Sequence, residues 1–330
     1  MISKGVGLFP TEPVGAIREY TLLAESLGYD NVWFGDSQNI WRESSVTMGA
    51  AAVGTKRVVF GTGVTNAVTR HRSLLASTWA TLAEYTGGRA ALGIGTGDSS
   101  LRTMGLTPLK LRELESAVTE LRALFRGESV AEEHSGAQFR LSYLAEPVKV
   151  PIYIAASAPK ILKLSGRIAD GVIVLVGTEP RFVEAALATI EEGAAESGRT
   201  LDDLHIVLWT PTAISTDPVQ AKDLARAHTA RVCIRPLPAA VDPALESAIA
   251  RIRDSYDYYH HMDTEAGHAD IVPDDLVDLF ALAGTPEQCR ERLEQVAKLG
   301  VDQVSIVPFV PPGQTRADTI RTFAEIADSL

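Results

Sequence analysis

The sequence predicts a (β/α)8 barrel, the TIM-barrel fold, formed by one domain that spans residues 1–330. Helix and strand signals alternate along almost the whole chain. The strands are continuously apolar, which is typical of a parallel sheet buried on both faces. About eight such units in a chain of this length favour a closed barrel over an open sheet. The predicted strands lie near residues 5–9, 31–35, 57–63, 90–95, 151–155, 171–176, 204–210 and 303–308.

The first helix–strand unit covers residues 12–36. Pro13 stands near the first turn of its helix, where the missing N–H costs little, and Gly28 ends the helix. The segment NVWF at 31–34 then predicts a short buried strand that closes at Gly35 and Asp36. One face of the helix is apolar, at Ile17, Tyr20, Ala24 and Leu27.

A second copy of this unit lies near the end of the chain. Thr285 and Gln288 form a capping box around Pro286, and Gly300 ends the predicted helix before a strand near 303–308. The junctions are alike, with LGYDNV after the first helix and LGVDQV after the second. This is a weak internal repeat of one unit and not a solenoid array.

Two segments interrupt the alternation. Residues 127–150 are polar and contain a candidate hairpin around 137–144. Residues 228–275 form a long insertion before the last unit. Long insertions in barrels usually lie over the mouth of the active site. We therefore expect the second insertion to help build the site.

Composition excludes several classes of protein. The net charge is −11 and no block of Lys and Arg stands out, so we expect no nucleic-acid partner. Cys233 and Cys289 are not part of a CxxC or Cys/His cluster, so no disulfide framework and no metal site are expected. The apolar part of the N-terminal segment is too short for a signal peptide, and no run approaches the roughly 18 apolar residues of a membrane span. We expect a cytoplasmic protein with no membrane partner.

The segment GIGTGDSS at 93–100 follows an apolar strand and is open to three interpretations. Glycine-rich backbone after a strand can expose several N–H groups to an anion, as in a phosphate or cofactor cradle. A dinucleotide fingerprint requires G-x-G-x-x-G opening directly into a helix, and the pattern here is G-x-G-x-G. The third interpretation is a strand end that lets a loop pass close to the barrel.

Other predicted strands also end in polar residues. Binding and catalytic groups of a barrel come from the carboxyl ends of its strands, so these residues together predict a site for a polar ligand. Each has a local alternative, because Asp36 and Ser157 could cap the next helices and Asn66 could belong to a turn. The polar strand ends lie at 9–12, 35–37, 63–66, 96–99 and 156–160.

Six motifs follow one another along the chain. They are GLFPTEP at 7–13, FGD at 34–36, GTGVTNAVTRH at 61–71, TGGRAALGIGTGDSS at 86–100, APKILKLSGRIADGVIV at 158–174 and AGTPEQC at 283–289. Together, in this order, they make the chain resemble the bacterial-luciferase-like superfamily of flavin- and deazaflavin-dependent oxidoreductases. Within it, the chain most resembles the methylenetetrahydromethanopterin reductase branch, which uses coenzyme F420. The resemblance covers nearly the whole chain and implies a TIM barrel with the cofactor at its C-terminal mouth.

The resemblance implies a set of cofactor contacts. Gly63 and Val64 match a strand bulge whose peptide bond is cis in the family, and residues 96–98 match an element beside the ring. Residues 157–160 would present the amides of a helix N-terminus to the cofactor phosphate. The implied contacts are Asp36, Ser37, Gly63, Val64, Thr65, Asn66, Thr96, Gly97, Asp98, Ser99, Ser157, Ala158, Pro159 and Lys160.

Asp98 and Glu12 are candidate general acids, and simple hydrogen bonding to loop backbone is the alternative for both. Candidate substrate contacts are Trp41, which has a counterpart in a sister branch of sugar-phosphate dehydrogenases, and three residues of the second insertion. Those three are Tyr259, His260 and His261. Adjacent histidines point apart on a helix, so they do not suggest a metal pair.

Two residues depart from the family pattern. Ala67 stands where a Pro is usual, and Ser37 stands where the sister branch has a His. Ser37 therefore argues against the His-based mechanism of that branch. The arginines and the histidine at 70–72 could meet an anionic cofactor tail or only solvent.

The resemblance implies an oxidoreductase that transfers a hydride between coenzyme F420 and a small organic substrate. One alternative is a two-component monooxygenase that uses FMN and oxygen, with a separate reductase supplying the reduced flavin. A second alternative is a non-catalytic cofactor-binding homologue, although the retained motifs at 63–64, 95–98 and 157–160 argue against it. The resemblance also implies a homodimer.

Overall fold

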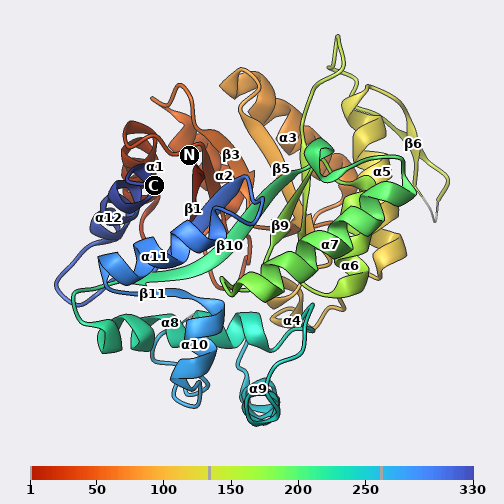
Figure 1. Ribbon diagram of the computed structural model, residues 1–330. Coiled ribbons are helices and arrows are strands. Elements are labelled where there is room, and N and C mark those ends of the chain that lie inside the picture. The colour runs from red at the N-terminus through yellow and green to blue at the C-terminus, as the bar shows by residue number, and fades with distance from the viewer. Residues whose placement is uncertain (1, 133–134, 261–262) are drawn as a thin grey trace.

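A closed barrel of parallel strands forms the centre of the molecule, and helices surround it (Figure 1). The computed structural model describes residues 2–132, 135–260 and 263–330. Pairing runs β1-β2-β3-β5-β8-β9-β10-β12 and returns to β1, which confirms the predicted (β/α)8 barrel. These strands are β1 (Ser3–Leu8), β2 (Asn31–Phe34), β3 (Val59–Thr62), β5 (Ala90–Gly95), β8 (Ile152–Ala156), β9 (Gly171–Val174), β10 (His205–Ile214) and β12 (Gln303–Pro308).

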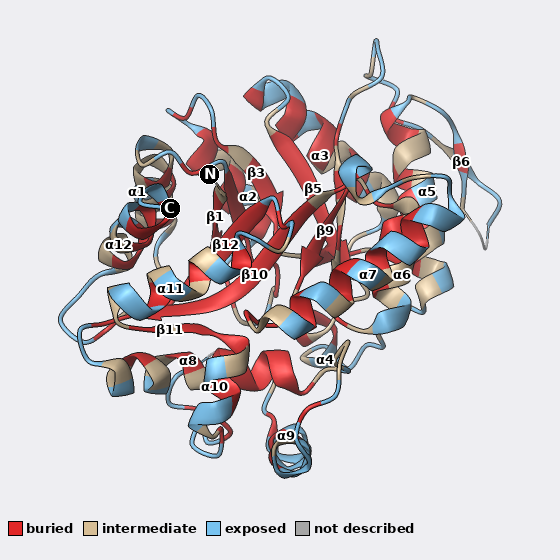
Figure 2. Ribbon diagram, in the orientation of Figure 1, coloured by how far each residue is buried: buried red, intermediate tan, exposed pale blue. Residues whose placement is uncertain are grey.

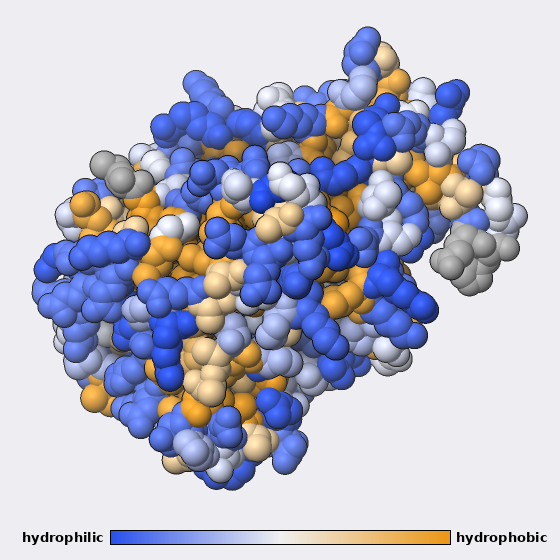
Figure 3. Space-filling view, turned by 45° about the vertical axis from the view of Figure 1, so that its right-hand side comes forward, coloured by the Kyte–Doolittle hydropathy of each residue, from blue (hydrophilic) through white to orange (hydrophobic). Residues whose placement is uncertain are grey.

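Helices cover the outside of the barrel, with buried faces against the strands and exposed faces outward (Figure 2). On the face that Figure 3 shows, hydrophilic residues predominate and apolar ones form separate patches between them. In the described part of the chain, no helix combines the length and the apolar character that crossing a membrane requires. The helices are α1 (Val14–Ser26), α2 (Ser44–Ala52), α3 (Arg72–Thr86), α4 (Ser99–Arg102), α5 (Leu111–Phe125), α6 (Pro159–Ile168), α7 (Pro180–Glu196), η1 (Leu201–Asp203), α8 (Pro218–Cys233), α9 (Pro243–Ser255), α10 (Asp274–Phe280), α11 (Pro286–Val296) and α12 (Arg316–Asp328).

Both copies of the predicted helix–strand unit form. The helix α1 begins directly after Pro13, and the chain leaves it through Gly28, whose φ of 76° suits glycine. The helix α11 begins with the predicted capping box, in which the Gln288 amide donates to Thr285 Oγ1 at 3.3 Å and the Thr285 amide donates to Gln288 Oε1 at 2.9 Å. Proline, glycine and capping residues in the local sequence thus determine where these helices begin and end.

Two buried indoles fill the barrel, and glycines on other strands make room for them. A Cβ on Gly61 would lie 2.2 Å from Trp33, and one on Gly7 would lie 2.6 Å from Trp209. The Trp33 Nε1–H donates to Gln303 Oε1 at 3.2 Å, so the buried polar edge of this ring has a partner. The interior is therefore a packed core up to the level of Trp209.

The two interruptions differ in part from the predictions. The first insertion does contain a hairpin, formed by β6 (Val130–Ala131) and β7 (Gln138–Phe139), and it begins before the predicted 137–144. The second insertion was placed too early, because α8 continues to Cys233 and residues 228–233 belong to a helix packed on the barrel. Two short strands escaped prediction, β4 (Thr65–Asn66) and β11 (Leu282–Gly284), since segments of two or three residues carry little pattern.

Candidate active site

A cavity of about 310 Å³ lies at the carboxyl ends of the barrel strands. The polar ends of β2, β3, β5 and β8 meet there, because parallel strands of a barrel end at one mouth. Of the fourteen expected cofactor contacts, the lining includes every one except Asn66 and Pro159. The lining members are Asp36, Ser37, Gly63, Val64, Thr65, Thr96, Gly97, Asp98, Ser99, Ser157, Ala158 and Lys160.

Asp36 is buried at the end of β2 and is held from several sides. It accepts hydrogen bonds from Thr65 Oγ1 at 2.6 Å and Ser44 Oγ at 3.0 Å, and it pairs with the Arg70 guanidinium. The helix after this strand is capped by Glu43 instead, so Asp36 is not its cap. Arg70 therefore serves this buried carboxylate, and neither of the two alternatives suggested for the 70–72 cluster describes it.

The loops around the cavity are joined to one another by hydroxyl groups. Ser37 Oγ lies 2.8 Å from Ser99 Oγ, which connects the loop after β2 to the start of α4. Asn66 lies just outside the cavity, where its Nδ2 donates to Ser100 Oγ at 3.1 Å and its Oδ1 accepts from the amides of Val68 and Thr69. Asn66 is thus the turn residue that the alternative interpretation described.

The glycine-rich segment forms the end of β5 and the turn that follows it. Gly97 has a φ of 89°, and a Cβ there would lie 2.3 Å from Leu101 Cδ1. Gly95 lines the cavity, so backbone there approaches whatever the cavity holds without an intervening side chain. Between β3 and β4, both of which pair with β5, the peptide bond between Gly63 and Val64 is cis, as the resemblance implies.

Asp98 is surrounded by arginines. Its carboxylate lies 3.2 Å from Arg102 Nε and 2.9 Å from Arg235 Nη2, and it also pairs with Arg231. Arg231 and Arg235 line the cavity themselves, so the carboxylate and two guanidinium groups form one charged wall. The Asp98 carboxylate thus joins three arginines at the edge of the cavity.

Glu12 lies outside the lining of this cavity. Burial works to raise the pKa of its carboxyl, but the Arg316 guanidinium at 2.8 Å and the Thr11 hydroxyl at 2.7 Å outweigh it, and the pKa is lowered. The group is therefore ionised at neutral pH, which does not suit a general acid.

The four expected substrate contacts are not all in one place. Trp41 lines the cavity, with its ring 4.5 Å from that of Phe9. Tyr259 lies in a neighbouring cavity of about 470 Å³ that shares Phe9 and Trp41, and its hydroxyl donates to the Thr103 carbonyl at 2.8 Å. His260 is exposed and lies 2.7 Å from Asp257, and His261 lies outside the described residues.

Three functional candidates on α8 and just after it escaped prediction. His228, Arg231 and Arg235 line the cavity, and their spacing of three and four residues puts them on one helix face. That spacing was readable in the sequence, but the segment was assigned to the insertion. Phe9 and Trp209 complete this side of the lining.

His228 is buried in the cavity wall between aromatic rings. The ring centroid of Phe309 is 5.9 Å away and that of Phe9 is 6.5 Å away. Burial first, and then the charge of Arg231, lower the pKa of His228 to about 3. The imidazole is therefore neutral at physiological pH.

The opposite side of the cavity suits a phosphate. The helix α6 begins at Pro159 with Ala158 as N-cap, and no side chain among the described residues caps it. Its N-terminus is reached from the cavity at Ser157, Ala158 and Lys160. Uncapped first-turn amides and the helix dipole favour an anion there. With apolar walls at Val64 and Ile173, the cavity fits a flat ring that carries a phosphate.

Comparison with known proteins agrees with this architecture. The model of the luciferase-like monooxygenase family matches residues 3–303. The 5,10-methylenetetrahydromethanopterin reductase of Methanolobus tindarius is 30% identical, over 95% of this chain and 96% of its own length. The F420-dependent glucose-6-phosphate dehydrogenase of Beutenbergia cavernae is 35% identical, over 63% of this chain and 66% of its own.

Solved structures show the same fold. The coenzyme F420-dependent tetrahydromethanopterin reductase of Methanopyrus kandleri superposes with a TM-score of 0.80 at 26% identity, over 98% of this chain and 97% of its own. The oxygenating component of a Pseudomonas putida 3,6-diketocamphane monooxygenase, solved with FMN, has a TM-score of 0.68 at 16% identity over 100% and 99% of the two chains, which shows a shared fold only. Matched by a family model along most of its length, the chain belongs to the luciferase-like monooxygenase family.

Proposed function

We propose that this protein is an oxidoreductase that binds coenzyme F420 in the barrel-mouth cavity and transfers a hydride between it and a small organic substrate. The observation that carries the proposal is the uncapped N-terminus of α6, which meets an otherwise partly apolar cavity beside Lys160. Relatives named for coenzyme F420 support this cofactor over FMN. When bound, the deazaflavin ring supplies the hydride chemistry.

The chain's own residues bind and orient. The backbone N–H groups of Ser157, Ala158 and Lys160 at the start of α6 would hold the phosphate, with the Lys160 side chain as counter-charge. Gly95 and Gly97 let the loop after β5 lie against the ring, because no side chain intervenes. Asp36 fixes the side chain of Thr65 in the cavity lining by accepting its 2.6 Å hydrogen bond. Trp41, Val64 and Trp209 exclude water from the ring.

We assign Asp98 and Glu12 roles other than general acid. Asp98 orders Arg231 and Arg235 in the cavity wall, where their charges face an anionic ligand. Glu12 joins the loop after β1 to α12 through Arg316. Both carboxylates are ion-paired to arginines, and neither assignment requires a proton to leave them.

Titration of the purified protein with coenzyme F420 and, separately, with FMN tests the proposed cofactor. We expect titration with F420 to give saturable fluorescence quenching. We expect FMN to bind at least tenfold more weakly. Tight FMN binding with weak F420 binding would favour the monooxygenase, and substrate-dependent oxygen uptake would then be measured. Binding of neither cofactor would favour the non-catalytic homologue.

A further inference from the structure

His228 is a titratable side chain of the cavity wall that carries no hydrogen bond at its buried Nδ1 among the described residues. Six titratable side chains line the cavity, namely Asp36, Asp98, Lys160, His228, Arg231 and Arg235. The two carboxylates are engaged by arginines. The His228 side chain is 98% buried, and among the described residues no group hydrogen-bonds its Nδ1. A buried polar atom without a partner is uncommon and calls for an explanation.

The surroundings of His228 fix its charge and favour one tautomer. Phe9 and Phe309 pack on the ring, and Arg231 lies one helical turn further along α8. An apolar setting and a neighbouring cation both oppose protonation, so the ring is neutral. An unpaired N–H costs more than an unpaired lone pair, so the proton belongs on Nε2 and not on the partnerless Nδ1.

We propose that His228 is a catalytic residue whose neutral imidazole N–H donates a hydrogen bond to a carbonyl or hydroxyl oxygen of the substrate. This inference rests on the proposed function and deepens it. The cavity wall supplies three cations, Lys160, Arg231 and Arg235, against two carboxylates, so a neutral or anionic oxygen is a better ligand than a cation. Hydride transfer at a carbon whose oxygen accepts this hydrogen bond makes the substrate class a ketone, an aldehyde or the corresponding alcohol.

The chemistry explains why a neutral donor is useful. Reduction of a carbonyl adds a hydride to carbon, taken from the cofactor that is oxidised, and a proton to oxygen, taken up from water. Negative charge grows on the oxygen while the new C–H bond forms. A fixed N–H dipole in an apolar wall stabilises that charge without first having to gain a proton. Reduction of an iminium ion gives a neutral amine and needs no such donor.

The test uses the full-length protein, coenzyme F420 and two acceptors, cyclohexanone and the 1-methylpyrrolinium ion. His228→Phe keeps a ring and removes both nitrogens, and His228→Gln restores an N–H donor. His260→Phe, on the exposed insertion, is the matched control. We expect His228→Phe to lower turnover of the ketone about 10- to 100-fold, with iminium turnover and F420 affinity within twofold of wild type. We expect His228→Gln to recover part of the ketone turnover.

Two readouts do not depend on turnover. The ¹⁵N resonances of the wild-type imidazole, assigned by their loss in His228→Gln, should show a neutral Nε2–H ring from pH 5 to 8. The infrared carbonyl stretch of cyclohexanone, bound with oxidised F420, should lie lower in wild type than in His228→Phe. Three outcomes would overturn the inference about His228 and leave the proposed function standing. They are an equal loss of turnover with both acceptors in His228→Phe, a carbonyl stretch that is the same in wild type and His228→Phe, and F420 binding by a wild-type protein that reduces no ketone. Absence of F420 binding would overturn the proposed function and the inference with it.

Discussion

The carboxylate of Asp98 lies 2.9 Å from Nη2 of Arg235, a residue 137 positions further along the chain. Asp98 follows β5 and Arg235 follows α8, so this ion pair joins two segments of the barrel mouth. Arg231 reaches the same carboxylate with a side chain that is only 8% exposed. Removal of the carboxylate would leave that guanidinium buried without its partner.

We therefore predict that Asp98→Asn lowers the free energy of unfolding by about 3 kcal/mol, the cost of breaking a largely buried ion pair. Urea denaturation checks this. The control is Arg102→Ala, which removes the more exposed partner of Asp98 and should cost less than about 1 kcal/mol. A stable Asp98→Asn protein that binds F420 normally but has lost turnover would instead support the general-acid role.

Gly97→Ala should be more damaging than expected for a half-buried loop residue. The φ of 89° is strained for alanine, and the new Cβ would meet the buried Leu101 at 2.3 Å. We expect a loss of about 2–4 kcal/mol in unfolding free energy and weaker F420 binding, because the loop beside the cavity must shift. Gly105→Ala separates the two causes, since its φ is 70° but nothing lies within 4 Å of the added Cβ. Gly105→Ala should lower the unfolding free energy by about 1 kcal/mol. An equal decrease in the two variants would refute the steric argument.

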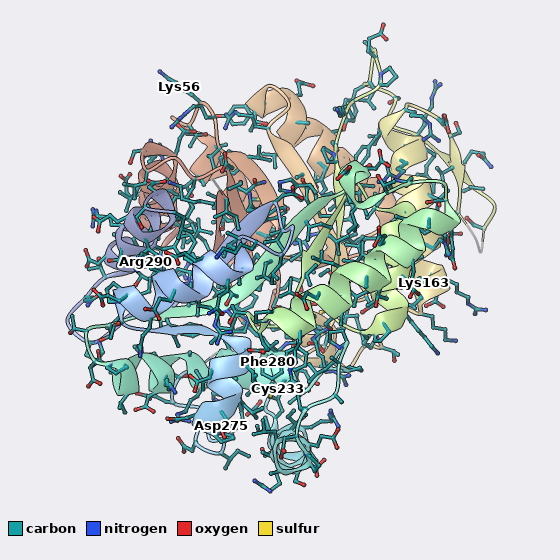
Figure 4. The ribbon with its side chains drawn as sticks, in the orientation of Figure 1. Lys56, Lys163, Cys233, Asp275, Phe280 and Arg290 are labelled. Atoms are coloured by element: carbon teal, nitrogen blue, oxygen red, sulfur yellow. The ribbon has the colours of Figure 1, made fainter. Side chains whose placement is uncertain are left out.

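Lys160 and Lys163 provide a matched pair on α6. Lys160 lines the cavity, whereas Lys163 lies on the outer side of the helix, where it pairs with Glu196 (Figure 4). We predict that Lys160→Ala weakens F420 binding about fivefold in 0.1 M salt and that the difference shrinks at 1 M, because salt screens the attraction. Fluorescence titration at both salt concentrations measures this. An equal effect of Lys163→Ala would mean that only the net charge of the protein matters.

The sequence predicted the barrel and most of its cavity for one physical reason. Parallel strands that close into a barrel must end together, so Asp36, Gly97 and Ser157 had to meet once the strands were recognised. The direction in which a loop side chain points carries no such constraint. Glu12 also follows a strand, yet it turns to Arg316 and away from the cavity. His228 was missed because its role depends on which face of α8 meets the barrel.

The buried His228 should make the protein less stable in acid. Its pKa is about 3 in the folded state and 6.5 in its ordinary environment, so below pH 6.5 the unfolded chain binds more protons than the folded one. Stability is therefore lost as pH falls from 6.5 toward 3, by about 2 kcal/mol from this group at pH 5.

Urea denaturation of wild type and His228→Gln at pH 7 and pH 5 isolates this contribution. Carboxylates such as Glu12 and Glu43, with lowered pKa values, also make stability fall in acid, and they do so equally in both proteins. The variant should thus lose about 2 kcal/mol less than wild type between the two pH values. His260→Gln should show the opposite sign, because the hydrogen bond to Asp257 raises the pKa of His260 and favours the protonated folded state. Parallel losses in wild type and His228→Gln would mean that His228 can take up a proton in the folded protein, which would remove the basis for a neutral donor in the cavity.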